Sequence, residues 1–260
     1  MPRYALDLEF DGRAFNGTQA QAVVRTLHAM VVEALTALDG ERPVLRFASR
    51  LDTGVSAEHL GADTTLRREW HARALVAALS SHLPPDVACI RAARVADDWH
   101  VRGAAKAKRY RYEVVLRPTR PVLDQRAAWV RSLDREDLLD GMAAMLPGHR
   151  DLSGFATLRH DDTDDDDPSR EIFAAGWTRE QRALGRYLVF RVEGAGFLYR
   201  QVRGMVGAML HIAKGREPVT LFAAAIAGGR AAERLGNIAP AHGLMLERIA
   251  YDPEPAWSVP

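Results

Sequence analysis

The chain has 260 residues, of which 47% are hydrophobic and 27% are charged, and its net charge is +1. This composition excludes an intrinsically disordered chain, and no apolar run approaches the roughly 18 residues of a membrane span. The start of the sequence lacks the apolar core of a secretory signal, and Cys89, the single cysteine, can form no internal disulfide. We therefore expect a cytoplasmic protein with one large domain or two ordinary ones.

Residues 1–101 predict the element order βαββαβ. Between Tyr4 and Phe10, apolar residues alternate with polar ones, which is typical of a half-buried strand. Apolar residues at helical spacing from Leu27 to Leu38 predict a helix that ends at Asp39-Gly40. The other expected elements are strands at 43–48 and 57–65, a helix over 69–83 and a strand at 87–95.

Residues 102–260 predict a similar order, βαββα(α)β. The expected elements are a strand at 107–116, a helix over 135–146, strands at 170–178 and 186–193, a long helix from about 197, a shorter helix after 217 and a strand at 244–251. The order βαββαβ is that of the ferredoxin-like fold. We therefore predict an α+β protein with two ferredoxin-like subdomains, 1–101 and 102–260, whose antiparallel sheets join and leave a catalytic cleft between them.

Charge is distributed unevenly along the chain. Residues 105–260 contain 23 basic and 21 acidic residues, and six of these acidic residues are the aspartates between Asp161 and Asp167. Such a run predicts a solvated loop. The rest of the second half is basic, as a nucleic-acid-binding surface requires.

The segment from Ser49 to Ser56 is the most unusual short stretch. It places Arg50 and Asp52 two residues apart in a loop between two expected strands. Taken alone, Asp52 ahead of Gly54 is typical of an ordinary turn. A functional interpretation therefore needs support from other parts of the chain.

That support comes from six segments that occur in order along the chain. They read FDGRAFNGTQ at 10–19, SRLDTGVS at 49–56, AKRYRY at 107–112, GHRDL at 148–152, GFLYRQVRGMVG at 196–207 and APAHGLML at 239–246. Together they resemble the motifs of the TruA-type tRNA pseudouridine synthases. Any one match would be weak, but six in order across nearly the whole chain favour membership of this family.

The resemblance implies an isomerase that converts uridine to pseudouridine in tRNA, without a cofactor or a metal. Asp52 would be the catalytic nucleophile, and Arg203 would pair with it and keep it ionised. Tyr110 would stack on the target uracil. Arg50 would bind substrate by helping to displace the base, and Leu244 would line the apolar wall of the pocket.

The two tyrosines of the third segment need separate interpretations. Tyr110 and Tyr112 lie on one face of the expected strand, because side chains alternate along a strand. Burial alone therefore cannot separate a substrate-stacking ring from a core ring. The motif assigns the first role to Tyr110, and Tyr112 suits the second better.

The resemblance also implies the partners. Family members act as homodimers on the anticodon stem-loop of tRNA, at positions 38 to 40, so we expect both tRNA and a second copy as partners. We expect no membrane association. The nine histidines show no metal-like grouping, and we expect no metal site.

Several residues depart from the family motifs close to the expected nucleophile. They are Thr18, Ser49, Leu51, Thr53 and Ser56, where the family has Trp, Gly, Thr, Ala and His. Loop neighbours shape how RNA is held, so two alternatives stay open. One is a divergent paralogue that modifies another RNA uridine, and the other is a non-catalytic RNA-binding protein on the same scaffold.

Overall fold

A computed structural model describes residues 1–157, 167–215, 217–229 and 235–258, and the chain forms two compact units. The first unit contains Met1–Lys108 and Met245–Pro260, and the second contains Arg109–Leu244. This division differs from the predicted one in two respects. The boundary falls after residue 108 rather than 101, and the C-terminal strand groups with the first unit.

The first unit has the predicted βαββαβ order. Its elements are β1 (Arg3–Phe10), α1 (Leu27–Asp39), β2 (Leu45–Phe47), β3 (Ser56–Thr65), α2 (Ala72–Ser80), β4 (Val87–Val95), the short α3 (Val101–Ala104) and β10 (Leu244–Tyr251). The strand order is β4-β1-β3-β10, with β2 also paired to β3. Strands β4, β1, β3 and β2 pair antiparallel, so the ferredoxin-like α+β fold of this unit is confirmed.

Strand β10, predicted as the last strand of the second subdomain, makes the sheet of the first unit mixed. It runs parallel to β3, with Met245 opposite Ser56 and Leu246 opposite Ala57. The short β2 occupies β3 only between Ala62 and Thr64. The first half of the β3 edge is therefore open to a second strand, and β10 pairs there.

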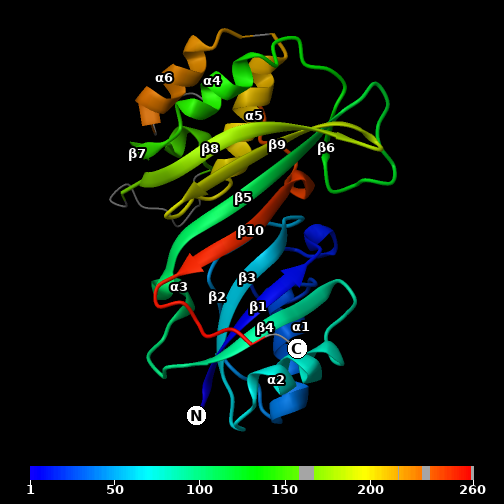
Figure 1. The fold of residues 1–260 in the computed structure, drawn as a ribbon, viewed down its shortest axis with the longest axis vertical. Helices are drawn as coiled ribbons and strands as arrows, with labels where there is room; N and C mark the ends of the chain where they lie inside the picture. Colours follow the sequence, from blue (N-terminus) through cyan, green and yellow to red (C-terminus); the bar gives the residue numbers. More distant parts are fainter. Residues whose placement is uncertain (158–166, 216, 230–234, 259–260) are drawn as a thin grey trace. The chain divides into compact units, whose positions relative to one another are not determined.

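The prediction of a half-buried β1 is wrong for the middle of the strand, where residues on both faces are buried, although Glu9 is exposed. Ala5 and Asp7, on the face expected to be polar, are as buried as Leu6. The C-terminal segment, red in Figure 1, runs back along the first unit, and Ser258 bridges to Ala92 of β4. Alternation correctly predicted the strand, but the segment that covers its outer face is distant in the sequence.

The second unit contains the predicted elements and two further strands. Its elements are β5 (Ala105–Leu116, which begins in the first unit), β6 (Ala128–Val130), α4 (Leu138–Ala144), β7 (Gly148–Asp151), β8 (Ser169–Arg182), β9 (Gly185–Gly194), α5 (Gln201–Ala213) and α6 (Thr220–Gly228). The strand order is β5-β9-β8-β7, and β6 pairs parallel with β5. The predicted joining of the two sheets and the cleft between them involve both units and stay predictions.

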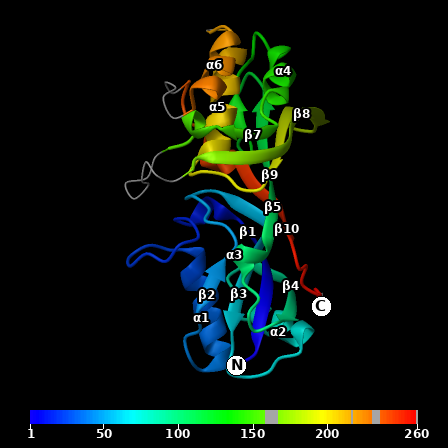
Figure 2. The same ribbon diagram turned by 90° about the vertical axis from the view of Figure 1, so that its left-hand side faces the viewer.

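Helix α5 carries Arg203 and lies with the other helices of the second unit. Figures 1 and 2 show α4, α5 and α6 together on one side of strands β7, β8 and β9. The helix begins at Gln201 rather than near Phe197, because Arg200 adopts a left-handed conformation with φ 60°. The buried Gln201 side chain accepts a hydrogen bond from the Leu198 N–H (3.0 Å) and donates one to the Leu152 carbonyl (3.1 Å).

Cys89 is buried, as expected for a core thiol, and burial raises its pKa to about 12.

Within the part of the chain that the structure describes, no helix has the length and apolar character needed to cross a membrane.

Candidate active site

Asp52 lies in the loop between β2 and β3, on a tight turn. The Val55 N–H donates to the Asp52 carbonyl (3.1 Å), and Gly54 has φ 83°. The Asp52 residue is half-buried rather than fully exposed. The ordinary turn geometry and the functional interpretation are therefore compatible, because the turn holds the carboxylate at the edge of the fold.

Leu51, the residue before Asp52, is hydrogen-bonded to Thr18, and both residues depart from the family motifs. The Leu51 N–H donates to the Thr18 hydroxyl (3.0 Å), and the Thr18 N–H donates back to the Leu51 carbonyl (3.2 Å). Thr18 is 1% exposed, so water does not replace these bonds. Gly17, with φ 81°, allows the close approach, since an added Cβ would lie 2.7 Å from the Leu51 carbonyl oxygen. We call this reciprocal pair the Thr18–Leu51 bridge.

A third departing residue holds the other side of the turn. The buried Ser56 hydroxyl accepts a hydrogen bond from the Gly12 N–H (2.9 Å). Gly12 lies against the loop so closely that an added Cβ would meet the Val55 carbonyl oxygen at 1.9 Å. The end of β1 and the turn around Asp52 therefore form one hydrogen-bonded layer.

Arg50 is exposed at the start of this loop. An exposed arginine could contact an RNA backbone, but many surface arginines have no such role. The role of Arg50 therefore stays a prediction.

Arg203 is anchored from the first turn of α5 by a second reciprocal pair. Its Nε donates to the Ala239 carbonyl (2.8 Å), and the Ala239 N–H donates to the Arg203 carbonyl (3.1 Å). The two motifs at 196–207 and 239–246 therefore meet in the structure. We call this pair the Arg203–Ala239 bridge. Its hydrogen bond from Nε fixes the direction of the Arg203 side chain.

The segment that anchors Arg203 is itself held by Tyr112. The Tyr112 hydroxyl donates to the Pro240 carbonyl (2.8 Å). An added Cβ at Gly243 would meet the Tyr112 ring at 2.6 Å, so only glycine allows this approach. Burial raises the pKa of Tyr112, and the nearby positive charge of Arg203 opposes that shift. Tyr112 is thus a structural tyrosine that stays protonated beside Arg203.

Tyr110 has different surroundings, although it is also buried, at 6% exposure. Its ring packs edge-on against Phe197, with centroids 5.2 Å apart and planes at 89°. Leu244 is 7% exposed. Burial does not separate the two tyrosines, as expected, but the Tyr112 hydrogen bond supports its interpretation as a core residue. The stacking role of Tyr110 and the wall role of Leu244 stay predictions.

The contacts given above join Asp52, Tyr110 and Arg203 each to a neighbour rather than to one another, so the site stays a prediction. Arg203 and Tyr112 gather around segment 239–243 in the second unit, and Asp52 has its own bonded layer in the first. The pairing of Asp52 with Arg203 and with Tyr110 involves both units and stays a prediction.

Lys108 is a residue that the sequence did not single out. It occupies a half-buried position on β5, two residues before Tyr110. Burial lowers the pKa of its ammonium group, and the charge of Arg102 lowers it further. It stands at the variable position of the segment AKRYRY, so the motif gave no signal for it.

The acidic run lies almost wholly outside the described residues. Residues Asp161 to Asp166 are outside the described ranges, so the predicted solvated loop also lies outside them. Asp167 is described, and its carboxylate accepts a hydrogen bond from the Ser169 N–H (2.8 Å). Over the described ranges, no three His, Cys, Asp or Glu side chains gather as metal ligands would.

Comparison with known proteins decides the family. The family model for tRNA pseudouridine synthase matches residues 142–252. A tRNA pseudouridine synthase A of Caulobacter sp. strain K31 is 34% identical over 256 residues, covering 98% of this chain and all of the relative. The chain belongs to the tRNA pseudouridine synthase A family.

Other relatives extend the match beyond one group of bacteria. The tRNA pseudouridine synthases A of Maricaulis maris and Myxococcus xanthus are each 34% identical to this chain, over 260 and 268 residues. They cover 98% and 100% of the chain, and the chain covers 100% and 96% of them. The family predicted from the six segments, and with it an isomerase of the pseudouridine synthase class, is confirmed.

Proposed function

We propose that the protein isomerises uridine to pseudouridine in the anticodon stem-loop of tRNA, at positions 38 to 40, with Asp52 as the nucleophile. The observation that carries this proposal is the full-length likeness to tRNA pseudouridine synthases A, together with an aspartate held on a bonded turn. In this reaction the bond from ribose C1′ to uracil N1 breaks and a bond from C1′ to C5 forms. N1 gains a proton and C5 loses one, so no electrons are exchanged with a cofactor.

A carboxylate suits the nucleophile's task because it is ionised at neutral pH and can leave again. Asp52 is half-buried, and a cation beside it would favour the ionised form. Arg203 would supply that cation. The Arg203–Ala239 bridge holds the guanidinium through Nε, and a guanidinium can also meet a carboxylate through its terminal nitrogens.

The target base would be held by the aromatic and apolar residues of the site. Tyr110 would stack on the uracil, with its ring orientation set by Phe197, and Leu244 would close the apolar side. A base in a stem must first leave its stack, which costs a few kcal/mol. Arg50, exposed beside Asp52, would compensate part of that cost by contact with the RNA.

The proposal includes the assembly and location of the enzyme. We propose a homodimer in which one tRNA contacts both subunits, working in the cytoplasm on newly made tRNA. Binding that depends on phosphate contacts should weaken steeply as salt increases.

The test is to incubate the protein with an unmodified tRNA that carries uridine at positions 38, 39 and 40 and at several other positions. Pseudouridine is then mapped at each position, and the molar mass is measured by light scattering. We expect product confined to positions 38 to 40 and a dimeric mass. Product only at other positions would favour the divergent paralogue, and binding without any product would favour the non-catalytic alternative.

A further inference from the structure

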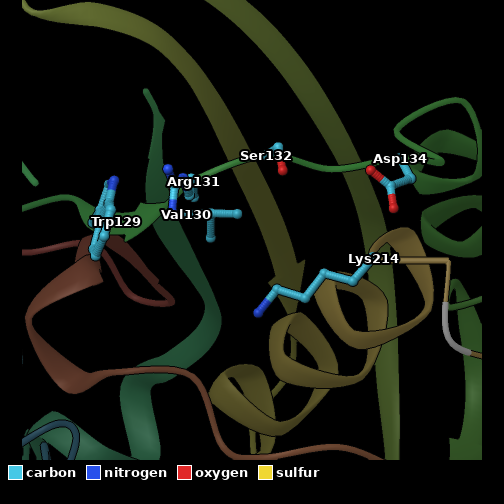
Figure 3. A pocket seen from close by; sticks show the side chains of 6 residues that line it. All are labelled: Trp129, Val130, Arg131, Ser132, Asp134 and Lys214. Carbon is cyan, nitrogen blue, oxygen red and sulfur yellow. The ribbon is translucent and has the colours of Figure 1, made fainter. Parts of the chain in front are cut away.

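The second unit contains a cavity that no residue of the proposed reaction lines. Its volume is about 470 Å³, and its lining residues are Trp129, Val130, Arg131, Ser132, Asp134 and Lys214. Figure 3 shows these side chains, which come from β6, the segment after it and the end of α5. Cavities of 300 to 1,000 Å³ are the usual size for small organic ligands.

Trp129 presents an aromatic face that is both exposed and fixed. The residue is 41% exposed, which is unusual for so large an apolar side chain. Its indole Nε1 donates to the Arg117 carbonyl (2.9 Å), so the ring does not need to be ordered by a ligand. A rigid exposed indole is a surface on which a nucleobase can stack at low entropic cost.

Two cations lie on the same cavity with no counter-ion among the residues that the structure describes. They are Arg131 and Lys214, both exposed. Several arginines elsewhere in the unit are neutralised, as in the Arg182–Glu113 pair at 2.7 Å. Cations left without a carboxylate partner beside an indole are suited to a phosphate group.

The acidic lining residue, Asp134, forms no ion pair with Arg131 or Lys214 among the described residues. Its side chain packs against Gly215, with an added Cβ there lying 3.6 Å from the Asp134 carboxylate. In Figure 3 the Lys214 side chain extends toward Val130, away from Asp134. The ammonium group is therefore directed to the part of the cavity next to Trp129.

An adjoining cavity extends the space available to a ligand. Its volume is about 390 Å³, and it shares Trp129, Val130 and Lys214 with the first. It adds polar groups from His211 and Asn237. A base on the indole, its ribose and a phosphate can thus be accommodated in the two cavities together.

We propose that Trp129, Arg131 and Lys214 form a second nucleotide-binding site, which holds one unpaired nucleotide of the tRNA by stacking on Trp129 and binds its phosphate through the two cations. The site uses only residues of the second unit, and none of them has a role in the isomerisation. The inference rests on tRNA being the substrate, but not on the identity of the modified position or of the nucleophile.

The test measures the Kd for full-length unmodified tRNA at low and moderate salt, using the whole protein. We expect Lys214→Ala and Arg131→Ala each to weaken binding about three- to tenfold, and to reduce the slope of log Kd against log salt by about one. The matched control is Arg73→Ala, which removes one exposed charge from α2 in the first unit and should change Kd less than twofold. Asp134→Asn should leave binding equal or tighten it.

The stacking part is tested by a pair of variants that both lose the indole hydrogen bond. Trp129→Phe keeps an aromatic face, and we expect its Kd to stay within about threefold of the unmutated protein. Trp129→Leu lacks that face and should bind about fivefold or more weakly. Turnover at saturating tRNA should stay within twofold for all of these variants.

Three outcomes would overturn the inference. One is binding within twofold in Lys214→Ala, Arg131→Ala and Trp129→Leu, and another is an equal loss in Arg73→Ala. The third is a loss of binding that follows a change in oligomeric mass, which would assign the cavity to a second copy of the chain. An unmutated protein that binds tRNA through this site but makes no pseudouridine would refute the proposed function and leave the inference standing.

Discussion

The loop that carries Asp52 and the helix that carries Arg203 are both held by reciprocal hydrogen bonds, but they differ in which atoms are used. At Arg203, the side chain that we propose to act takes part itself, through Nε and the Ala239 carbonyl. Near Asp52, the hydrogen bonds are made by neighbouring residues instead. Leu51 is bonded to Thr18, and the Ser56 hydroxyl accepts from the Gly12 N–H. The direction of the Arg203 side chain is thus fixed by its own hydrogen bond, whereas the Asp52 turn is fixed through its neighbours.

The turn around Asp52 is held through the hydroxyls of Thr18 and Ser56, which accept from backbone N–H groups. Thr18 and Leu51 are two departures from the family motif, and they bond to each other. Departures beside the expected nucleophile are therefore no argument against catalysis in this chain. Substitutions at Arg203, Gly12 and Thr18, and a pH experiment on His59, would break or sharpen this account.

Arg203→Ala should have the largest effect of these. It removes both the cation expected to face Asp52 and the side-chain half of the Arg203–Ala239 bridge. Loss of one preorganised charge donor typically lowers kcat by about 10² to 10³. The measurement is the single-turnover rate of pseudouridine formation. Arg203→Lys should recover only part of it, because a lysine cannot form the forked contact, and full recovery would reject a directional role.

Gly12→Ala should come next, through stability as well as rate. The added methyl would collide with the Val55 carbonyl, so the Asp52 turn or the end of β1 must shift. We expect about 1–3 kcal/mol of destabilisation in urea unfolding, with a lower rate. The matched control is Gly103→Ala, since an added Cβ there meets nothing within 4 Å. Equal stability of the two variants would show that the loop is not closely packed on Gly12.

Thr18→Val keeps the shape of the side chain but leaves the buried Leu51 N–H without its acceptor. A buried donor without a partner costs about 1–3 kcal/mol. We expect a lower kcat with a tRNA KM that changes less than twofold, because the turn would hold Asp52 less well while the RNA-contacting surface is intact. Thr18→Ser should restore kcat. A rise in KM alone would mean that Thr18 serves substrate binding instead.

The smallest effect should come from His59, on the covered face of the first unit. The Asp7 carboxylate hydrogen-bonds His59 (2.9 Å) and raises its pKa above about 6.5; Glu58 adds to this shift, while burial and Arg91 oppose it. The stabilisation is thus fully present below pH 6.5 and is lost as the pH rises through the folded-state pKa. The imidazole is 40% exposed, so the loss should be small.

His59→Gln should flatten this part of the pH dependence of unfolding. The measurement is the urea midpoint of both proteins at a series of pH values from below 6.5 upward. Parallel curves for the two proteins would rule out His59 as the titrating group.

Much of the fold was predictable from the sequence because its helices and long strands have strong local patterns. Helix α1 ends at Gly40 in the left-handed conformation, as the Asp39-Gly40 pair predicted. The three-residue β6 and the four-residue β7 were missed, whereas the equally short β2 was expected. The parallel register of β10 on β3 joins residues far apart in sequence, and no local pattern encodes it.

The candidate site was predictable only in part, for a similar reason. The motifs located Asp52, Arg203 and Tyr110, because those segments are distinctive in themselves. The Thr18–Leu51 bridge joins positions 33 apart, and a threonine and a backbone N–H give no sequence signal of their pairing. The exposed face of Trp129 was likewise invisible, because apolar residues are expected inside.

The most direct measurement is the single-turnover rate and the Kd of Asp52→Ala with unmodified tRNA, compared with the unmutated protein. The account predicts no detectable pseudouridine from the variant, with a Kd within about threefold, because only the attacking carboxylate is removed. Pseudouridine formation by Asp52→Ala at a rate within about tenfold of the unmutated protein would contradict it.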